Sequence, residues 1–129
     1  MATILILEDE TFVREMLALS SRADGYTLLE ASTVVEAQQV LSSHSIDALV
    51  ADVVLPGGGN GIAFALALVE SQPKVRVLFM SGWPLRDMYD KPLSQMPPGS
   101  FALLQKPIGN RELLQEIRTL LGDARRGAG

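Results

Sequence analysis

Polar side chains that suit a cation or a phosphoryl group follow four apolar runs of this chain, each where a strand is expected to end. The runs and the residues that follow them are Thr3–Leu7 with Glu8 and Asp9, Ala48–Ala51 with Asp52, Val75–Met80 with Ser81, and Phe101–Gln105 with Lys106. The set offers carboxylate oxygens, which magnesium prefers as ligands, and an ammonium and a hydroxyl group that can pair with phosphoryl oxygens. If the four strand ends meet, their chemistry suits a divalent cation and a phosphoryl group.

The elements that must position these side chains alternate along the chain, because stretches with helical spacing separate the short apolar runs. Such alternation predicts βαβ units and a parallel sheet. In an open parallel sheet, ligands bind in the crevice beyond the carboxyl ends of the strands. We therefore predict an α/β fold that gathers the polar residues at one edge of its sheet.

Apolar spacing and end signals place the remaining elements. A helix is expected at Thr11–Ala23, followed by Gly25, and a strand at Tyr26–Ala31. A capping box of Thr33 and Glu36 opens the next helix, and a further helix is expected at Gly61–Ser71 with Phe64 and Leu68 toward the sheet. The last helix has Asn110 as its expected N-cap and ends at Gly122. The stretch 83–99 contains four prolines, so any helix there should be irregular.

Composition excludes several classes of protein. The 129 residues include no cysteine, which rules out disulfides and thiolate metal sites, and the formal net charge of -4 gives no reason to expect direct nucleic-acid binding. No apolar run approaches the roughly 18 residues that span a bilayer, and the start lacks the basic region of a signal peptide. We expect a cytoplasmic protein without membrane insertion, with one domain at 1–122 and a flexible tail at 123–129. The short tail favours a complete single-domain protein.

The acidic residues suggest a magnesium site. Glu8, Asp9 and Asp52 would offer carboxylate oxygens, and the backbone carbonyl of Val54 is a further candidate ligand. Crowded carboxylates repel one another, so a bound cation would relieve the repulsion.

The remaining residues suggest phosphoryl chemistry. A carboxylate can attack phosphorus and form an aspartyl phosphate, and Asp52 directly follows a buried run that would orient it. Lys106 can pair with a phosphoryl oxygen, and Ser81 can donate a hydrogen bond to another. The bond from Lys106 to Pro107 is a candidate cis peptide that would aim the lysine.

Taken together, these residues resemble the receiver domain of bacterial two-component response regulators, of the single-domain type. The segments that carry the resemblance are Ile4–Glu10, Asp52–Pro56 with Asn60-Gly61, Phe79–Gly82 and Leu104–Pro107. The resemblance covers essentially the whole chain. It implies a flavodoxin-like, doubly wound five-stranded parallel sheet with strand order 2-1-3-4-5 and five helices, of which the fourth is expected to be irregular here.

The resemblance also implies a function. Asp52 would accept a phosphoryl group from a histidine of a partner kinase or histidine phosphotransfer protein, with magnesium held by Glu8, Asp9 and Asp52. Ser81 and Lys106 would contact the phosphoryl group and shift toward it, which changes the surface presented to a downstream protein or to a second copy in a homodimer. Such a chain catalyses its own phosphoryl transfer and loss, and is not an enzyme acting on external substrates.

One departure from the family keeps an alternative open. Family members usually carry Tyr or Phe as a switch residue three positions before the lysine, whereas this chain has Leu103. A pseudo-receiver that binds partners without phosphorylation is therefore an alternative. A phosphohydrolase that works through an aspartyl phosphate is another, but such enzymes commonly need a carboxylate two residues after the nucleophile, where this chain has Val54. A flavin-binding protein of the same fold is a weaker alternative.

Two smaller features complete the interpretation. Val54 and Trp83 are expected at the rim of the site, where apolar side chains would hinder water and prolong the phosphorylated state. His44 is the only histidine and is expected to be a solvated residue near a helix end, so the donor histidine must belong to another protein.

Overall fold

The structure is a computed structural model that describes residues 2–53, 60–82, 93–97 and 99–122. Five parallel strands form one sheet in the order β2-β1-β3-β4-β5. The strands are β1 at Thr3–Leu7, β2 at Thr27–Ala31, β3 at Ala48–Asp52, β4 at Arg76–Ser81 and β5 at Phe101–Gln105. The predicted α/β class and strand order are confirmed.

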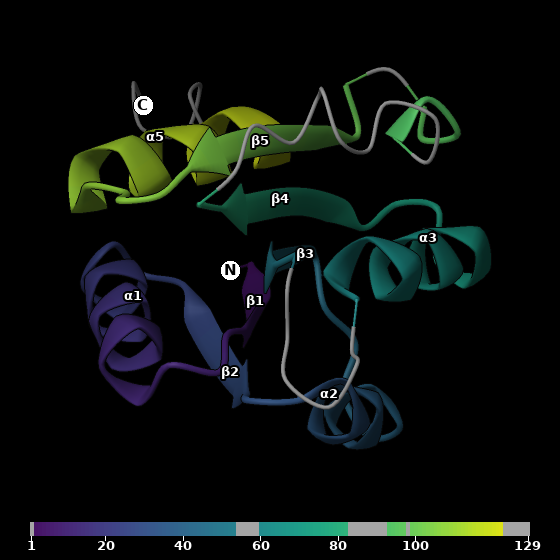
Figure 1. Ribbon diagram of the computed structural model, residues 1–129, viewed down its shortest axis with the longest axis horizontal. Coiled ribbons are helices and arrows are strands. Elements are labelled where there is room, and N and C mark those ends of the chain that lie inside the picture. Colours follow the sequence, from purple (N-terminus) through teal and green to yellow (C-terminus); the bar gives the residue numbers. More distant parts are fainter. Residues whose placement is uncertain (1, 54–59, 83–92, 98, 123–129) are drawn as a thin grey trace.

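Helices cover both faces of this sheet (Figure 1), with α1 and α5 on one side and α2 and α3 on the other. Their bounds are α1 at Thr11–Ala23, α2 at Val34–Leu41, α3 at Gly61–Ser71 and α5 at Asn110–Leu121. Within the described ranges these are the four helices. The stretch 83–99, where an irregular fourth helix was expected, is described only at 93–97 and 99. None of the described helices is long and apolar enough to cross a membrane.

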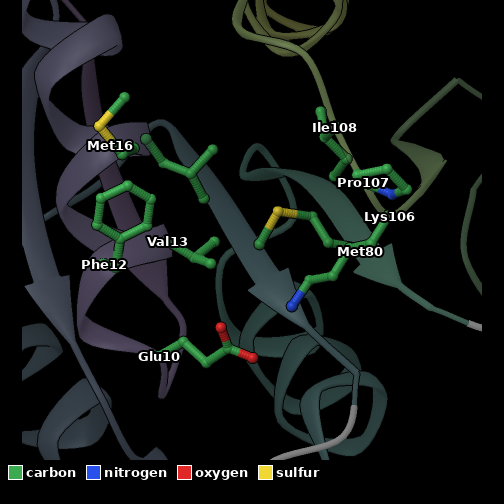
Figure 2. Close-up of a pocket in the computed structure, with 9 residues that line it drawn as sticks. Glu10, Phe12, Val13, Met16, Met80, Lys106, Pro107 and Ile108 are labelled. Atoms are coloured by element: carbon green, nitrogen blue, oxygen red, sulfur yellow. The ribbon is translucent and has the colours of Figure 1, made fainter.

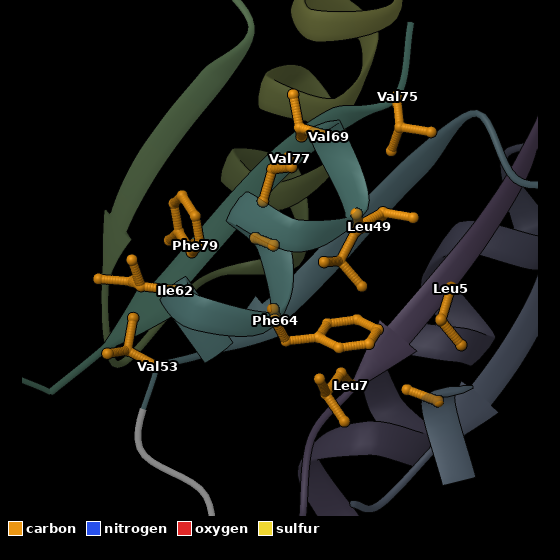
Figure 3. Packing of buried hydrophobic residues seen from close by; sticks show 14 of the residues in the cluster. Leu5, Leu7, Leu49, Val53, Ile62, Phe64, Val69, Val75, Val77 and Phe79 are labelled. Atoms are coloured by element: carbon orange, nitrogen blue, oxygen red, sulfur yellow. The ribbon is translucent and has the colours of Figure 1, made fainter. Parts of the chain in front are cut away.

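Strand alternation divides the core into two clusters, one on each face of the sheet. Leu5 and Leu7 of β1 join the cluster beneath α2 and α3, while Ile4 and Ile6 join the cluster beneath α1 and α5. All four side chains are fully buried, which explains why the strands are nearly continuous apolar runs. Figure 3 shows Phe64 of α3 lying among the side chains of the first cluster, so the predicted sheet-facing side of α3 is confirmed.

The helix ends follow the local signals with one correction. Thr33 Oγ1 accepts a hydrogen bond from the Glu36 N–H at 3.1 Å, as a capping box requires, and the Glu36 carboxylate accepts from the Ser32 N–H at 2.8 Å. Gly122 ends α5 with φ 71°. The prediction of Asn110 as N-cap of α5 is wrong, because the carbonyl of Gly109 already accepts the first helical hydrogen bond, from Leu113 N at 3.0 Å.

Candidate metal centre at the carboxyl edge of the sheet

The three carboxylates predicted to meet do lie together. One oxygen from each of Glu8, Asp9 and Asp52 lies within 4.8 Å of the other two. The cause is the sheet order: β1 and β3 are neighbours, and Leu7 pairs with Ala51, so the residues that follow these two lie side by side. Glu8 is fully buried, Asp52 is 8% exposed, and Asp9 is the most exposed of the three.

Lys106 lies directly against this acidic cluster. Its Nζ donates hydrogen bonds to Glu8 Oε1 at 2.7 Å and to Asp52 Oδ2 at 3.0 Å. Ser81 ends β4 with its side chain buried, and its main-chain oxygen accepts a hydrogen bond from Lys106 N at 2.7 Å. The Lys106–Pro107 peptide bond is cis. All five polar residues named from the sequence therefore lie at one edge of the sheet.

The charges in this cluster do not balance locally. Burial raises the pKa of the Glu8 carboxyl above its usual value, and the negative charge of Asp52 acts in the same direction, while hydrogen bonds from Lys106 and the Glu10 N–H oppose the rise. Burial would lower the pKa of Lys106, but its hydrogen bonds to Glu8 and Asp52 outweigh that effect and raise it. The cluster thus contains one ammonium group, that of Lys106, and more than one negatively charged carboxylate.

The donor set fits a magnesium ion. Two ligand oxygens on opposite sides of Mg²⁺ lie about 4.2 Å apart, so three oxygens within 4.8 Å need only small adjustments to share one ion. The exposure of Asp9 leaves that side of the site open to the water ligands that Mg²⁺ usually keeps. The further ligand predicted from the sequence, the carbonyl of Val54, lies outside the described residues.

Backbone packing fixes Asp52 from beneath. Val53 N donates to Met80 O at 3.0 Å, and Gly61 N donates to Val53 O at 2.9 Å, so the start of α3 closes onto the end of β3. A Cβ atom on Gly61 would overlap the main-chain oxygen of Asp52 and lie 3.1 Å from its carbonyl carbon. Only glycine permits this approach without a shift of the backbone. The sequence motif that contains Gly61 did not reveal this role of the residue.

Sequence reasoning missed Arg14 as a member of this region. Its Nη1 donates to the main-chain oxygen of Glu8 at 3.0 Å, and its Nε lies 3.4 Å from Glu30 Oε1 of β2. The available signal was an arginine in the first turns of the helix that directly follows the acidic pair.

A groove of about 490 Å³ borders the site (Figure 2) and was also missed. Its walls come from α1, the end of β4 and the segment after β5, and Lys106 and Glu10 lie at one end of it. Phe12 is 75% exposed and Met16 is 38% exposed, although their spacing with Leu17 is that of a buried stripe. The groove is lined by Glu10, Phe12, Val13, Met16, Leu17, Met80, Lys106, Pro107 and Ile108.

The other residues named from the sequence lie apart from the charged cluster. Leu103 is partly buried and packs against the core cluster beneath α2 and α3, as does Phe101, whose ring meets that of Phe79 edge-on with centroids 6.2 Å apart. His44 is exposed just after α2, as expected. Val54 and Trp83, predicted at the rim, lie outside the described residues.

A doubly wound sheet with an acidic cluster and a lysine at its carboxyl edge defines a class of signalling module. Residues 4–118 match the family model of the response regulator receiver domain, and the chain belongs to that family. The acidic pocket of such domains binds Mg²⁺, and the cluster described above could hold a metal ion.

Particular relatives place the chain within two-component signalling. It is 36% identical over 118 residues to the aerobic respiration control protein ArcA of Escherichia coli (strain K12), covering 92% of this chain and 48% of that protein. It is 32% identical over 124 residues to the sensor kinase CckA of Brucella abortus (strain 2308), covering 93% of this chain and 12% of that protein. The chain therefore spans about half, or less, of the length of these curated relatives.

Solved structures confirm the fold. The chemotaxis response regulator CheY4 of Vibrio cholerae superposes with a TM-score of 0.81 at 23% identity, covering 94% of this chain and 99% of that one. A CheY-like receiver domain protein from Methanospirillum hungatei JF-1 superposes with a TM-score of 0.84 at 20% identity, covering 98% of each chain.

Proposed function

We propose that this chain is a phosphoacceptor receiver in which Asp52 takes a phosphoryl group from a histidine of a partner protein. The observation that carries the proposal is the contact of one lysine with two carboxylates: Lys106 Nζ lies 2.7 Å from Glu8 and 3.0 Å from Asp52, inside a cluster that fits Mg²⁺. Family membership supports the class of function, and the geometry supports the assignment of Asp52.

The chemistry follows from what each group can supply. An oxygen of the Asp52 carboxylate attacks phosphorus, a new O–P bond forms, and the N–P bond to the donor histidine breaks with its electron pair leaving on the imidazole. Lys106 neutralises charge on the phosphoryl oxygens, and the buried Ser81 hydroxyl donates a hydrogen bond to one of them. Glu8, Asp9 and Asp52 would hold the Mg²⁺ ion, which would supply further positive charge next to the phosphoryl group.

A change of partner at Lys106 would convert this reaction into a signal. In the structure, Lys106 Nζ donates to both Glu8 and Asp52. A phosphoryl group on Asp52 competes for the same ammonium group and for Ser81, so the ends of β4 and β5 shift toward it. Leu103, on β5, would carry that shift to the surrounding surface by repacking against the core cluster, and a downstream protein would read the result.

The groove of Figure 2 supports a histidine-bearing protein as the donor. A donor must bring its phosphohistidine next to Asp52. Lys106 contacts Asp52 and lies at one end of the groove. The exposed Phe12 and Met16 provide apolar surface on the way to the site. We propose that the donor protein packs on this part of α1 while its phosphohistidine reaches the acidic cluster.

A pseudo-receiver remains the second candidate, and the observation that favours it is Leu103. Leu103 packs against the core cluster and lacks the aromatic ring of the usual switch residue. Such a domain would bind its partner through the same surfaces without accepting a phosphoryl group.

One mass measurement separates the two candidates. The intact protein is incubated with acetyl phosphate, with and without MgCl₂, as the wild type and as Asp52→Asn. The receiver predicts a magnesium-dependent gain of one phosphoryl group in the wild type that Asp52→Asn loses. Asp47→Asn is the matched control, because Asp47 lies just before β3, at its other end, and it should behave as the wild type. If the wild type gains no mass with several small phosphodonors, the receiver is contradicted and the pseudo-receiver is the candidate that fits.

A further inference from the structure

We infer that Arg14 is a positioning residue for the metal centre, held in its place by Glu30. The guanidinium group fixes the backbone between the acidic residues at the end of β1, and so sets where their carboxylates lie. The inference deepens the proposed function and rests on it, because it concerns the magnesium site of that function.

The first step is the contact itself. Arg14 Nη1 donates to the carbonyl oxygen of Glu8 at 3.0 Å, from a side chain that is only 18% exposed. Glu8 N donates to Ala31 O of β2 at 3.0 Å, so the peptide groups on both sides of Glu8 are fixed. The carbonyl that Arg14 holds belongs to the Glu8–Asp9 peptide. Its orientation determines the direction in which the exposed ligand Asp9 leaves the backbone.

The second step is what orients Arg14. Glu30 of β2 lies 3.4 Å from Arg14 Nε and 3.2 Å from Arg22 Nη2, so two arginines of α1 share one carboxylate. A guanidinium group can use two nitrogens in a fixed plane at once, here one toward Glu30 and one toward Glu8. A lysine has a single point of contact and cannot reproduce both.

Arg22 provides a matched control within the same ion-pair cluster. It pairs with the same carboxylate from the same helix, but it lies eight residues farther on, about 12 Å along the helix axis from Arg14. Its side chain is 54% exposed, against 18% for Arg14. Removing Arg22 takes away the same charge from Glu30 without touching the backbone of the acidic residues.

A role of Arg14 in charge and a role in positioning predict opposite changes in Mg²⁺ affinity when Arg14 is replaced. Loss of a cation near an acidic cluster makes the cluster more negative, which by Coulomb's law tightens Mg²⁺ binding. Loss of the hydrogen bond that fixes the Glu8–Asp9 peptide loosens the ligand geometry, which weakens binding. Groups that orient metal ligands typically change metal affinity by about 10- to 100-fold when they are removed.

The experiment is isothermal titration calorimetry with MgCl₂ on the wild type, Arg14→Gln, Arg14→Lys, Glu30→Gln and Arg22→Gln, with urea unfolding of each variant. We expect Arg14→Gln to raise the Mg²⁺ dissociation constant roughly tenfold. Arg14→Lys and Glu30→Gln should have smaller effects in the same direction, and Arg22→Gln should leave binding unchanged or slightly tighter. The two arginine variants should unfold at similar urea concentrations.

The outcomes separate the inference from the function beneath it. If the wild type binds Mg²⁺ and Arg14→Gln binds it equally well or more tightly, the inference is overturned while the proposed function stands. Equal weakening in Arg14→Gln and Arg22→Gln would also overturn it, because Arg22 bonds to Glu30 and not to the Glu8 carbonyl, so the shared loss would not come from that hydrogen bond. A wild type that binds no Mg²⁺ would overturn the proposed function itself. Should Arg14→Gln fail to fold, Arg14→Lys and Glu30→Gln decide the matter.

Discussion

Two groups of charged side chains in this molecule contain similar contacts in different surroundings. At the carboxyl edge of the sheet, Lys106 bonds to Glu8 and Asp52, and the three side chains are 24%, 0% and 11% exposed. At the surface, Arg118 of α5 bonds to Asp24 after α1, with side chains 45% and 21% exposed. The surface pair matches one cation with one anion. The buried group has one cation for two carboxylates, with Asp9 nearby.

The difference shows where a ligand can act. An exposed ion pair contributes little, because water and salt already screen its charges. A buried group with unbalanced charge is costly, because desolvation is only partly offset by the ion pairs within it. We therefore expect the stability of the buried group to change strongly when its charge changes, as it would with a metal ion or a phosphoryl group.

The largest expected effect comes from removing the cation of the buried group. Lys106→Met leaves Glu8 and Asp52 without their shared partner, and we expect a loss of about 3 kcal/mol in the free energy of unfolding at neutral pH. MgCl₂ should restore part of the loss, because a divalent cation takes over the neutralisation. The measurement is urea unfolding with and without MgCl₂.

Arg118→Gln is the comparison for that measurement. It breaks the surface pair, and its unfolding midpoint should stay close to that of the wild type, both without MgCl₂ and with it. Equal destabilisation by the two substitutions would show that burial does not distinguish the two groups.

A smaller effect is expected from the backbone beneath the buried group. Gly61→Ala places a Cβ atom against the main-chain oxygen of Asp52, so α3 and the end of β3 must move apart. We expect a loss of about 1–3 kcal/mol in the free energy of unfolding and a slower gain of phosphoryl mass from acetyl phosphate. Gly82→Ala is the control, because a Cβ atom there meets no atom of the described residues within 4 Å. If Gly61→Ala matched Gly82→Ala in both measurements, the close approach would not constrain the site.

The smallest effect is a pH dependence. Burial raises the pKa of Glu8 above its ordinary value of 4.5, so the folded state holds a proton there that the unfolded state has already lost. Stability contributed by this group therefore falls as the pH rises from 4.5 through the raised pKa of the folded state. Glu8→Gln cannot ionise, so its unfolding midpoint should vary less with pH over this window than that of the wild type.

Magnesium sharpens the same test. Bound Mg²⁺ favours the ionised carboxylate, so it should reduce the pH dependence of the wild type in that window. A wild type and Glu8→Gln with identical pH profiles, without magnesium, would show that the Glu8 carboxyl does not titrate differently in the folded and unfolded states.

Much of the fold could be predicted from the sequence because a doubly wound sheet buries its strands on both faces. Burial on two faces requires apolar runs, and the bounds of β1 and β5 were predicted without error. β3 and β4 extend one residue beyond the predicted runs, to Asp52 and Ser81, because strand pairing does not depend on the polarity of the last side chain. β2 and β4 each begin one residue later than predicted, at Thr27 and Arg76. The N-cap of α5 was predicted one residue too late, because the main-chain carbonyl of Gly109, not that of Asn110, accepts the first helical hydrogen bond.

The sequence by itself determined which polar side chains gather at the carboxyl edge of the sheet, since acidic, hydroxyl and amino side chains at strand ends must meet where parallel strands end. Only the tertiary structure decided how they are held. The exposure of Phe12, the approach of Gly61 to Asp52 and the reach of Arg14 to Glu8 depend on distances between elements. Periodicity reports which side of a helix is apolar, but the packing of whole elements decides whether that side is covered and which backbone atoms a side chain can reach.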